Sequence, residues 1–600
     1  MRGPVKRPAI AVAAIVMLAG CARVPKKPDS MTRGDYSYVK EYITWLVKKE
    51  MKKQDVTGLS IALVDDQQVV WAEGFGFADK ANKVPATPET IYRAGSISKL
   101  FTATMAMQLV EQGKLDIDKP LQSYLPEFSI RSRFPDAGPI TPRNIMTHHS
   151  GLPSDFSKGM WAEHPEPFEN VVNQIRDEYV ASPPNYVFSY SNVGATLLGH
   201  ALEKVAGRDF AVHMEASVLR PLGMTHSTFS QAPDRSLLGT KAYRNGNEVE
   251  EFSLRDIPAG GLNSNVLDLS RFMQMVFAGG WAGERQIIKP ETLAEMLRPQ
   301  NTEVPLDLNF RIGLAWMLSG LGSINARDAG PIAHHGGATR NHHSLLVVLP
   351  GQKLGVVVMS NSATGGPVVN KAAIEALKLA LEAKTGIKRP VQAKTATGER
   401  ALAQDALQKY EGRYATVFGV VNVTRGSGYL RTEIMGTSFR LVPRPDGMLG
   451  LQRRLLGIRI NLGQLGRIGI SQATIDGRVI VKTSMDGEEV LVGERIRAVP
   501  IPGAWQKRAG EYEIVNAGDD AALIDKIRLR QDNGLLLVEF SSPLSAGWAS
   551  RAIMPLSDSE ALFNGLGRGM GETIRSVSSG GEELLQYSGY LLRKKQNQRL

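Results

Sequence analysis

Cysteine is almost absent from this chain, because Cys21 is the only one among 600 residues. A single thiol excludes internal disulfides and cysteine-based metal sites, so the fold has to rely on its hydrophobic cores. Low-complexity tracts and long runs of lysine or arginine are also missing. The net charge is +11, but dispersed charge of this kind is not typical of nucleic-acid binding, and we expect no nucleic-acid partner.

Two common catalytic signatures are missing as well. The sequence contains neither a Gly-x-Ser-x-Gly elbow nor a His-Glu-x-x-His zinc helix. Histidines do gather in one segment, at positions 334, 335, 342 and 343, and a metal cluster there is the alternative to a metal-free site. No acidic residue lies within that segment, so we expect no metal and no cofactor.

The N-terminus has the features of an export signal. Arg2, Lys6 and Arg7 precede the apolar stretch AIAVAAIVMLAG, which is too short to span a bilayer. The following Leu-Ala-Gly-Cys resembles a bacterial lipoprotein signal, in which Cys21 is lipidated; an ordinary secretory signal is the alternative. We therefore expect a signal peptide over 1–20, a tether over 21–34, and a membrane-anchored protein of the cell envelope facing the periplasm. Because Ala22, and not aspartate, follows the cysteine, this resemblance favours the outer membrane.

Six hundred residues are too many for one core, and the pattern predicts several domains. Residues 35–386 combine amphipathic helices, at about 36–53, 96–112 and 368–386, with apolar strand pairs. One strand pair turns at Asp65-Asp66 and the other, SLLVVLPGQKLGVVVMSNS, at Pro350-Gly351. The first and last strands lie far apart in sequence. This segment therefore predicts a mixed α/β domain with an antiparallel sheet flanked by helices.

The C-terminal part has a different character. Residues 387–405 are polar and read as a linker, and short alternating strands with Gly-rich turns follow. LQKYEGRYATV from Leu407 aligns with WQKRAGEYEIV from Trp505, and GEEVL from Gly487 with GEELL from Gly581. Two matches at similar offsets predict two related all-β modules, 406–499 and 500–600, each long enough for a small antiparallel barrel. Chance similarity is the alternative.

The segment RAGSISKLFT places Ser96 three residues before Lys99 at the start of an apolar helix. At that spacing the ammonium group can reach the hydroxyl, which is one way to activate a serine without histidine. The spacing is weak on its own, because Ser37 and Lys40 share it. A serine at the start of a helix is also commonly only a cap.

Two further triplets complete a candidate site. Tyr190-Ser191-Asn192 precedes a helix, and His335-Gly336-Gly337 precedes the second strand pair. Each triplet has a counterpart of the same form elsewhere, at Tyr243-Arg244-Asn245 and His149-Ser150-Gly151, so order and context have to decide. A buried aromatic for Tyr190 and a helix cap for Asn192 are the structural alternatives.

With these contexts, residues 35–385 resemble the serine β-lactamase-like family, which includes class C β-lactamases, low-molecular-weight penicillin-binding proteins, D-aminopeptidases and related esterases. The motifs that carry the resemblance occur in the order of the family: TIYRAGSISKLFTA, GKLDIDKPLQSYLPE, ITPRNIMTHHSGLP, FSYSNVGATLLG, IPAGGLNSNVLDLSRFM and HHGGATRNHHSLLVVLPGQKLGVVVMSN. The resemblance implies a β-lactamase/transpeptidase-like domain followed by the two barrel-like modules.

The resemblance also implies roles for individual residues. Ser96 is the acylated nucleophile, Lys99 the cation beside it, and Tyr190 the general base, while Asn192 positions the substrate. His335 stands where many relatives carry the lysine of a Lys-Thr-Gly triplet, with Gly337 following it. The backbone N–H groups of Ser96 and Ala338 form the oxyanion hole.

The departures from the family pattern bear on the substrate. A histidine is mostly uncharged near neutral pH, so a site with His335 has less reason to select a carboxylate than one with lysine. Arg340 could compensate, and His342 and His343 are expected at the rim, whereas Asp268 is expected to be structural. We expect a serine hydrolase that cleaves amide or ester bonds of small or peptide substrates, with cell-wall-derived peptides among them. A β-lactamase or penicillin-binding protein is the first alternative, and a non-catalytic envelope binding or scaffold protein is the second.

Overall fold

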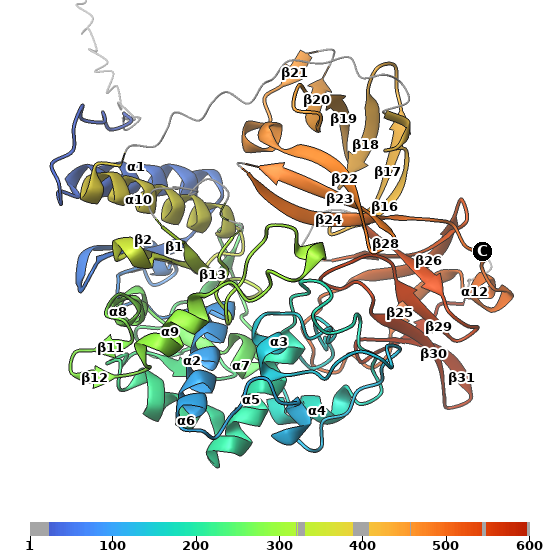
Figure 1. Cartoon of the computed structure of the whole chain (residues 1–600), viewed down its shortest axis with the longest axis horizontal. Helices are drawn as coiled ribbons and strands as arrows, with labels where there is room; N and C mark the ends of the chain where they lie inside the picture. The colour runs from blue at the N-terminus through green and yellow to red at the C-terminus, as the bar shows by residue number, and fades with distance from the viewer. Residues whose placement is uncertain are drawn as a thin grey trace, which may run out of the picture.

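The computed structural model describes residues 23–319, 321, 330–387, 407–455, 458–485, 487–542 and 548–596. The predicted signal peptide, Cys21 and most of the 387–405 linker lie outside these residues. Three bodies are visible in Figure 1: a mixed α/β domain, and two β-modules beside it. Within the described ranges, none of the helices is both long enough and apolar enough to cross a bilayer.

The α/β domain is organised around a six-stranded sheet with the strand order β13-β14-β15-β1-β2-β3. The two predicted strand pairs meet at its centre, where β1 pairs antiparallel with β15. Its strands are β1 (Gly58–Asp65), β2 (Gln68–Asp79), β3 (Val84–Pro85), β13 (Ala333–Ala338), β14 (His343–Leu349) and β15 (Leu354–Ser360). Strands from both ends of the domain thus form one antiparallel sheet, as the sequence predicts.

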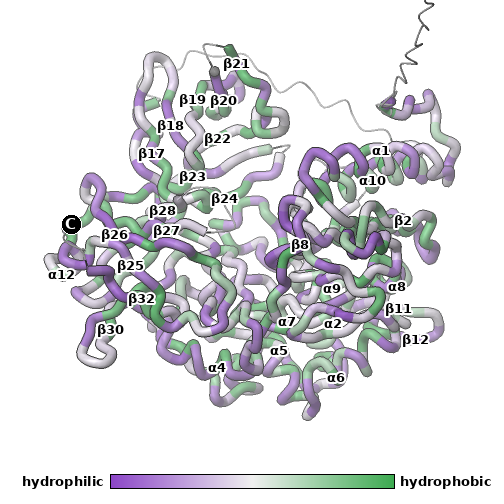
Figure 2. Tube along the Cα trace, turned by 180° about the vertical axis from the view of Figure 1, so that it is seen from behind, coloured by the Kyte–Doolittle hydropathy of each residue, from purple (hydrophilic) through white to green (hydrophobic). Residues whose placement is uncertain are grey.

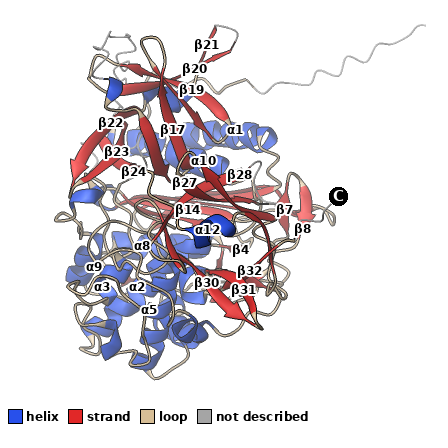
Figure 3. Ribbon diagram, turned by 90° about the vertical axis from the view of Figure 1, so that its right-hand side faces the viewer, coloured by secondary structure: helices blue, strands red, loops and turns tan. Residues whose placement is uncertain are grey.

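Helices cover both faces of this sheet (Figure 3). The long helices α1 (Ser37–Lys53) and α10 (Gly366–Thr385) lie side by side on one face and bury their apolar residues with those of β1, β14 and β15. On the other face α2 (Ser98–Glu111) and α8 (Val266–Phe277) lead into a larger core of helices. The candidate site lies on the side of α2 that faces the edge strand β13.

Most of the remaining elements of this domain are short. The helices are α3 (Pro142–Met146), α4 (Val171–Gln174), α5 (Asn192–Ala206), α6 (Phe210–Met214), α7 (Ile257–Gly260) and α9 (Pro290–Leu297). The strands are β4 (Tyr92–Arg93), β5 (Trp161–Ala162), β6 (Thr228–Phe229), β7 (Ala242–Arg244), β8 (Asn247–Val249), β9 (Ser253–Leu254), β10 (Leu262–Ser264), β11 (Trp281–Ala282) and β12 (Arg285–Gln286).

Both C-terminal modules are eight-stranded antiparallel barrels, which confirms the predicted fold class. The first consists of β16 (Gly412–Thr416), β17 (Gly419–Arg425), β18 (Leu430–Ile434), β19 (Thr437–Pro443), β20 (Leu449–Leu455), β22 (Gly469–Ile475), β23 (Arg478–Met485) and β24 (Glu488–Ile496), with β21 (Ile458–Ile460) beside β20. It closes because β16 pairs with β24 and β19 with β20. Figure 2 shows how hydropathy changes along the strands of both barrels.

The second barrel follows the short helix α12 (Gly503–Lys507). Its strands are β25 (Gly510–Ile514), β26 (Lys526–Asp532), β27 (Leu535–Ser541), β28 (Trp548–Pro555), β29 (Glu560–Phe563), β30 (Thr573–Ser579), β31 (Glu582–Tyr587) and β32 (Tyr590–Lys594). They form a closed barrel in sequence order. A buried core that includes Trp505 and Phe563 fills it.

Of the two sequence matches that predicted the internal repeat, the structure supports the first and contradicts the second. Tyr414 and Tyr512 occupy the same place in the first match, and each donates its hydroxyl to the carbonyl four residues earlier, at 2.7 Å to Tyr410 and 2.6 Å to Arg508. The two GEE segments, however, begin at Gly487 in the last strand pair of the first barrel and at Gly581 in the sixth-to-seventh strand turn of the second. A short turn sequence recurs at any hairpin, so the second match is not evidence of a shared register.

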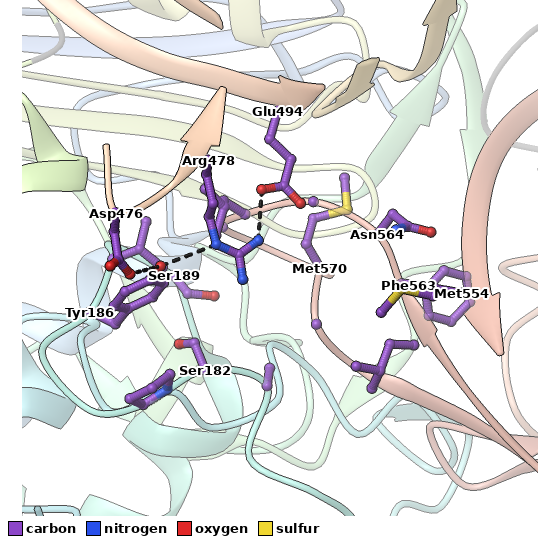
Figure 4. Close-up of a pocket in the computed structure, with 18 of the residues that line it drawn as sticks. Ser182, Tyr186, Ser189, Asp476, Arg478, Glu494, Met554, Phe563, Asn564 and Met570 are labelled. Carbon is purple, nitrogen blue, oxygen red and sulfur yellow. Dashed lines mark hydrogen bonds and ion pairs between the residues drawn. The ribbon is translucent and has the colours of Figure 1, made fainter. Parts of the chain in front are cut away.

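All three bodies meet at a crevice of about 320 Å³. Tyr186 of the α/β domain donates to Asp476 at 2.7 Å and accepts from Arg478 at 3.1 Å, and Arg478 pairs with Glu494 at 2.7 Å. Figure 4 shows these groups facing Phe563 and Met570 of the second barrel. Polar contacts therefore link the first barrel to the α/β domain where the second barrel also touches it.

Candidate active site

Ser96 lies in a tight turn just before α2. The helix was predicted to begin at Ser96, but residues Gly95–Ile97 form a 3-10 turn and α2 begins at Ser98. Gly95 has a φ of +55°, and a Cβ there would stand 2.7 Å from the backbone nitrogen of Ala338. Ser96 does not cap α2, since no side chain accepts a hydrogen bond at the N-cap position Ile97. The turn instead presents the partly exposed Ser96 to the cleft.

Lys99 is buried directly beside Ser96, with 3% exposure. Its Nζ donates to Ser96 Oγ at 3.2 Å, to Asn192 Oδ1 at 2.7 Å and to the carbonyl of Ala259 at 2.7 Å. Burial, and secondarily the positive charge of Arg568, lowers the pKa of Lys99 to about 7. A substantial fraction of Lys99 is therefore neutral near pH 7 and able to accept a proton.

Asn192 can bind Lys99 because its neighbour Ser191, and not Asn192 itself, caps α5. Ser191 is the N-cap of α5, and its hydroxyl accepts from the backbone of Gly194 at 2.9 Å. Asn192 holds Lys99 with its oxygen and donates its amide nitrogen to Asp155 Oδ1 at 2.6 Å. The structural alternative, in which Asn192 caps the helix, is thus wrong.

The hydroxyl of Tyr190 is buried and makes no hydrogen bond of normal geometry. Lys99 Nζ lies 4.9 Å from the centre of its ring. Burial raises the pKa of Tyr190 to about 12, although the nearby Ser96 hydroxyl and the charge of Arg568 oppose the shift. A phenol with a raised pKa stays protonated at neutral pH, which makes Tyr190 a better proton donor than proton acceptor.

His335 lies on β13 opposite Tyr190, with 6.2 Å between the ring centres. Burial, together with the charge of Lys99, lowers its pKa to about 3, so the imidazole is neutral. Its Nδ1 lies 2.6 Å from the carbonyl of Gly336, and since a carbonyl can only accept, Nδ1 carries the proton. The buried Nε2 has no partner and is left as a hydrogen-bond acceptor.

The other histidines of that segment do not form a cluster with His335. His334 Nε2 meets the carbonyl of Ser319 at 2.9 Å, and His343 Nε2 that of Ala363 at 2.9 Å. His342 is buried 3.7 Å from Glu251, so it does not lie at the rim as expected, whereas His343 does line the cleft. Among the described residues, no three potential metal-binding side chains come together.

Close packing of β13 against the Ser96 turn sets the position of Gly337 and Ala338. A Cβ at Gly337 would stand 1.9 Å from the carbonyl oxygen of Ala94, so only glycine fits there. Ser344 on β14 donates to the same carbonyl at 2.7 Å. The backbone of Ala338 is thereby held next to the backbone of Ser96, where two N–H groups can serve one oxyanion.

The two triplets that share the form of the site motifs, at Tyr243 and His149, make structural contacts outside the site. His149 pairs with the buried Asp307 at 2.7 Å, and Tyr243 accepts from the backbone of Lys80 at 2.7 Å. Asp268 accepts from the backbone of His226 and from Ser227, both at 2.8 Å, which fits its expected structural role.

His148 also lies at the site, although its sequence context does not mark it as a site residue. Its ring lies 4.1 Å from that of Tyr190, centre to centre. Its Nδ1 accepts from the backbone of Ser191 at 3.2 Å, so the proton is on Nε2, which is buried and unpaired. The motif THHSGLP held the signal, but nothing in it indicates which of its two histidines faces the site.

Arg568 is the second residue that was missed, and it comes from the second barrel. It forms an ion pair with Asp155 at 2.9 Å, and its guanidinium lies 5.1 Å from the centre of the Tyr190 ring. A chain of contacts thus runs from Arg568 through Asp155 and Asn192 to Lys99. The only sequence signal is the Gly-rich segment NGLGRGMGE, which resembles many exposed loops.

The loop between β29 and β30 is fixed to the α/β domain directly after Arg568. The backbone of Gly569 donates to Ser154 Oγ at 2.8 Å, and the buried Glu572 accepts from the backbone of Ser154 at 2.8 Å. A Cβ at Gly571 would stand 2.2 Å from the carbonyl oxygen of Ala181. The second barrel therefore forms part of the site wall.

The site opens into a cleft of about 610 Å³. The lining residues come from the α/β domain and from the second barrel module. Among them are Ser96, Asp155, Trp161, Tyr190, Asn192, His335, Ala338 and Arg340 of the former, and Leu523 and Arg568 of the latter. Arg340 lies over the ring of Phe252, 5.1 Å from its centre. Its Nε and Nη1 are buried without a hydrogen-bond partner, while the side chain lines the cleft.

Comparison with known proteins agrees with this architecture. Residues 43–381 match the Beta-lactamase family, which is more than half of the chain, and the chain belongs to that family. Protein flp of Staphylococcus aureus (strain N315) is 24% identical over 327 residues, 54% of this chain and 63% of that protein. Beta-lactamase-like protein 2 of Dictyostelium discoideum is 28% identical over 302 residues, 48% of this chain and 54% of that protein. The chain thus covers less than two thirds of the length of these relatives.

Solved structures share the fold over a longer part of the chain. The octameric penicillin-binding protein homologue from Pyrococcus abyssi is 24% identical with a TM-score of 0.51, covering 76% of this chain and 100% of that chain. SurE, crystallised with D-Leu, is 23% identical with a TM-score of 0.52, covering 76% of this chain and 99% of that chain. At this identity the likeness concerns the fold.

Proposed function

We propose that this protein is a serine hydrolase that cleaves amide or ester bonds through an acyl-enzyme on Ser96. The observation that carries the proposal is the contact of 3.2 Å between Ser96 Oγ and a buried Lys99 whose pKa is lowered to about 7. A neutral amine within hydrogen-bond reach can take the serine proton as the hydroxyl attacks a carbonyl carbon. A purely structural lysine would more commonly be paired with a carboxylate.

The remaining groups fit the later steps. Negative charge develops on the carbonyl oxygen, and the backbone N–H groups of Ser96 and Ala338 are placed to receive it. Tyr190, protonated at neutral pH, gives its proton to the leaving amine or alcohol and recovers one from Lys99. Water then attacks the acyl carbon and gives a proton to the same pair, and the bond to Ser96 Oγ breaks as that oxygen takes a proton back. This order reverses the expected role of Tyr190 as the base, because burial raises its pKa.

Substrate choice follows from the charges in the cleft. The neutral His335 supplies no positive charge, but Arg340 and Arg568 both line the cleft, and Arg568 lies 5.1 Å from the centre of the Tyr190 ring. These cations favour a substrate with an anionic group, so a peptide with a free carboxylate is the preferred class. SurE, a structural relative, was crystallised with D-Leu, which supports D-amino-acid peptides as candidates. Penicillin-type recognition, favoured by the same Arg340, is the second candidate.

A substrate panel tests the proposal. The mature chain and its Ser96→Ala variant would be assayed with a short-chain nitrophenyl ester, a D-alanyl nitroanilide, a chromogenic cephalosporin, and D-amino-acid dipeptides with free or amidated C-termini. We expect turnover that the variant loses, and a preference for the free carboxylate that Arg340→Gln removes. Equal rates for wild type and Ser96→Ala would contradict the mechanism, and no turnover of any substrate would favour a binding protein.

Placement in the cell envelope is a further proposal, since it depends on residues outside the described ranges. The lipid on Cys21 predicts that the full chain fractionates with membranes and that Cys21→Ser releases it. The variant remaining with membranes would contradict the anchor.

A further inference from the structure

The first barrel encloses a cavity that the proposed hydrolase activity does not use. Its volume is about 450 Å³, within the range of about 300–1,000 Å³ that is usual for small-molecule sites. The wall is almost entirely apolar and is contributed by nearly every strand: Tyr414, Val421, Val423, Ile434, Phe439, Leu441, Leu451, Ile470, Val481 and Val492 are among the lining residues. A polar ligand would lose its hydrogen bonds with water in such a site without gaining others.

The related second barrel shows that this space is not a general property of the module. There the interior is filled, and Trp505 is fully buried at one end. The repeat places Leu407 at the position of Trp505, so the first barrel has a much smaller side chain at that end. The inward-facing Ile434, Ile470 and Val481 of the first barrel are only partly buried, as expected for side chains around open space. Protein interiors are otherwise close-packed.

The cavity opens to solvent between loops at one end of the barrel. Phe418, Met435 and Leu465 line it and are 53%, 75% and 51% exposed. They lie in the connections β16–β17, β18–β19 and β21–β22. Alternate connections of an antiparallel barrel share one end, so these three apolar side chains surround a single entrance. Exposed apolar side chains that surround an entrance are typical of ligand-binding sites.

We propose that the first barrel binds the hydrocarbon chain of a single-chain anionic amphiphile, such as a fatty acid. An apolar cavity of this volume inside an eight-stranded barrel can hold one unbranched hydrocarbon chain. The charge of the module favours an anionic head group, because residues 406–499 contain 14 lysines and arginines against 8 aspartates and glutamates. On the outer face of the same strands Arg431 and Arg440 surround Tyr429, at 5.6 Å and 4.2 Å from its ring centre.

Binding would be measured on the full mature chain with dodecanoate, by displacement of a fluorescent fatty acid and by calorimetry. We expect one saturable site. Ile434→Trp places a large ring in the cavity and should weaken binding by at least about tenfold, with unchanged or higher thermal stability. Glu433→Trp places the same ring on the exposed outer face one residue earlier and should change the affinity by less than about twofold.

Three results would overturn the cavity site: no saturable binding by the wild-type chain, equal weakening by both tryptophan variants, or strong unfolding caused by Ile434→Trp alone. The last result would mean that the barrel is already packed. Catalytic turnover is not part of this test, so the hydrolase proposal can fail without affecting it.

Dodecanol tests the head group. We expect it to bind more weakly than dodecanoate at low ionic strength, with Arg440→Gln reducing the difference. Equal affinities would overturn the anionic preference while leaving the chain site intact. A lysophospholipid of the same chain length distinguishes the source, since stronger binding than dodecanoate would assign the site to membrane lipid and weaker binding to free fatty acid.

Discussion

Arg568 of the second barrel lies 2.9 Å from Asp155 of the α/β domain, beside the ring of Tyr190. The two residues are far apart in sequence, and their contact joins a separate module to the site. Through Asn192, the same Asp155 is linked to Lys99. The second barrel is therefore in a position to influence both the shape of the cleft and the ionisation of the groups in it.

Replacing Arg568 with alanine should alter both activity and its pH dependence. The positive charge of Arg568 helps to lower the pKa of Lys99, so its removal leaves Lys99 protonated to a higher pH. Solvent screens this partly exposed cation, and we expect a loss in kcat/KM of about five- to tenfold. The acidic limb of the pH–rate profile should move to higher pH.

Arg568→Lys keeps the charge, so the acidic limb should stay close to its pH in the wild type. The control is Arg593→Ala, which changes a half-exposed arginine of the same barrel. A profile unchanged in Arg568→Ala would mean that the barrel only covers the site.

The pH profile itself distinguishes the two candidate bases. If neutral Lys99 accepts the proton of Ser96, the rate should fall as pH drops below about 7, which is the pKa that burial gives Lys99. Tyr190→Phe should lower the rate by about 10²- to 10⁴-fold while keeping the position of this limb. Lys99→Met should remove the limb together with nearly all activity. A limb that disappears in Tyr190→Phe would assign the base to the tyrosine.

His335 should make the folded state sensitive to acid. Burial lowers its pKa from about 6.5 to about 3 in the folded chain, so the unfolded chain binds more protons between these values. The free energy of unfolding should therefore decrease as pH falls through this range, by a few kcal/mol in total.

Urea unfolding between pH 4 and 7 measures this effect. His335→Gln should be less stable than wild type at pH 7 but show a flatter dependence on pH, whereas His226→Gln, at a half-exposed site, should follow wild type. Parallel curves for wild type and His335→Gln would contradict a buried neutral imidazole.

Two neighbouring glycines test how the second barrel docks. Gly571→Ala adds a Cβ that would stand 2.2 Å from the carbonyl of Ala181, and its φ is +73°. Gly569 has a similar φ of +71° but no atom within 4 Å of such a Cβ. Both changes strain the backbone, but only Gly571→Ala should also push the loop away from the α/β domain.

We expect Gly571→Ala to destabilise the chain by about 1–3 kcal/mol more than Gly569→Ala, and to lower turnover in parallel. Thermal unfolding and the ester assay measure the two effects. Equal effects from the two substitutions would mean that contact with Ala181 is unimportant.

Much of the α/β domain was predictable because its signals are local. The strand pairs turn at Asp65-Asp66 and Pro350-Gly351, and α10 ends at Thr385, directly before Gly386, whose φ is +75°. Apolar periodicity and turn residues dictate such elements within a short window. The start of α2 was displaced because close approach of Gly95 to β13, a tertiary contact, selects a tighter turn.

The composition of the site was only partly predictable. Ser96, Lys99, Tyr190, Asn192 and His335 were found from motifs, and the structure brings them together. Ionisation was not predictable, since the raised pKa of Tyr190 depends on burial by the whole domain. Arg568 was missed because its place in the cleft results from the docking of two domains, which leaves no periodic pattern in the sequence.

The most direct test of the account is to trap the acyl-enzyme. The mature chain would be reacted with an activated ester or a slowly hydrolysed β-lactam, quenched in acid, and analysed by intact-mass and peptide mass spectrometry, beside Ser96→Ala and Ser37→Ala. We predict one acyl group per chain, on the peptide that contains Ser96, in wild type and Ser37→Ala and none in Ser96→Ala. An adduct of equal yield in Ser96→Ala, or one located on another residue, would contradict the proposed mechanism.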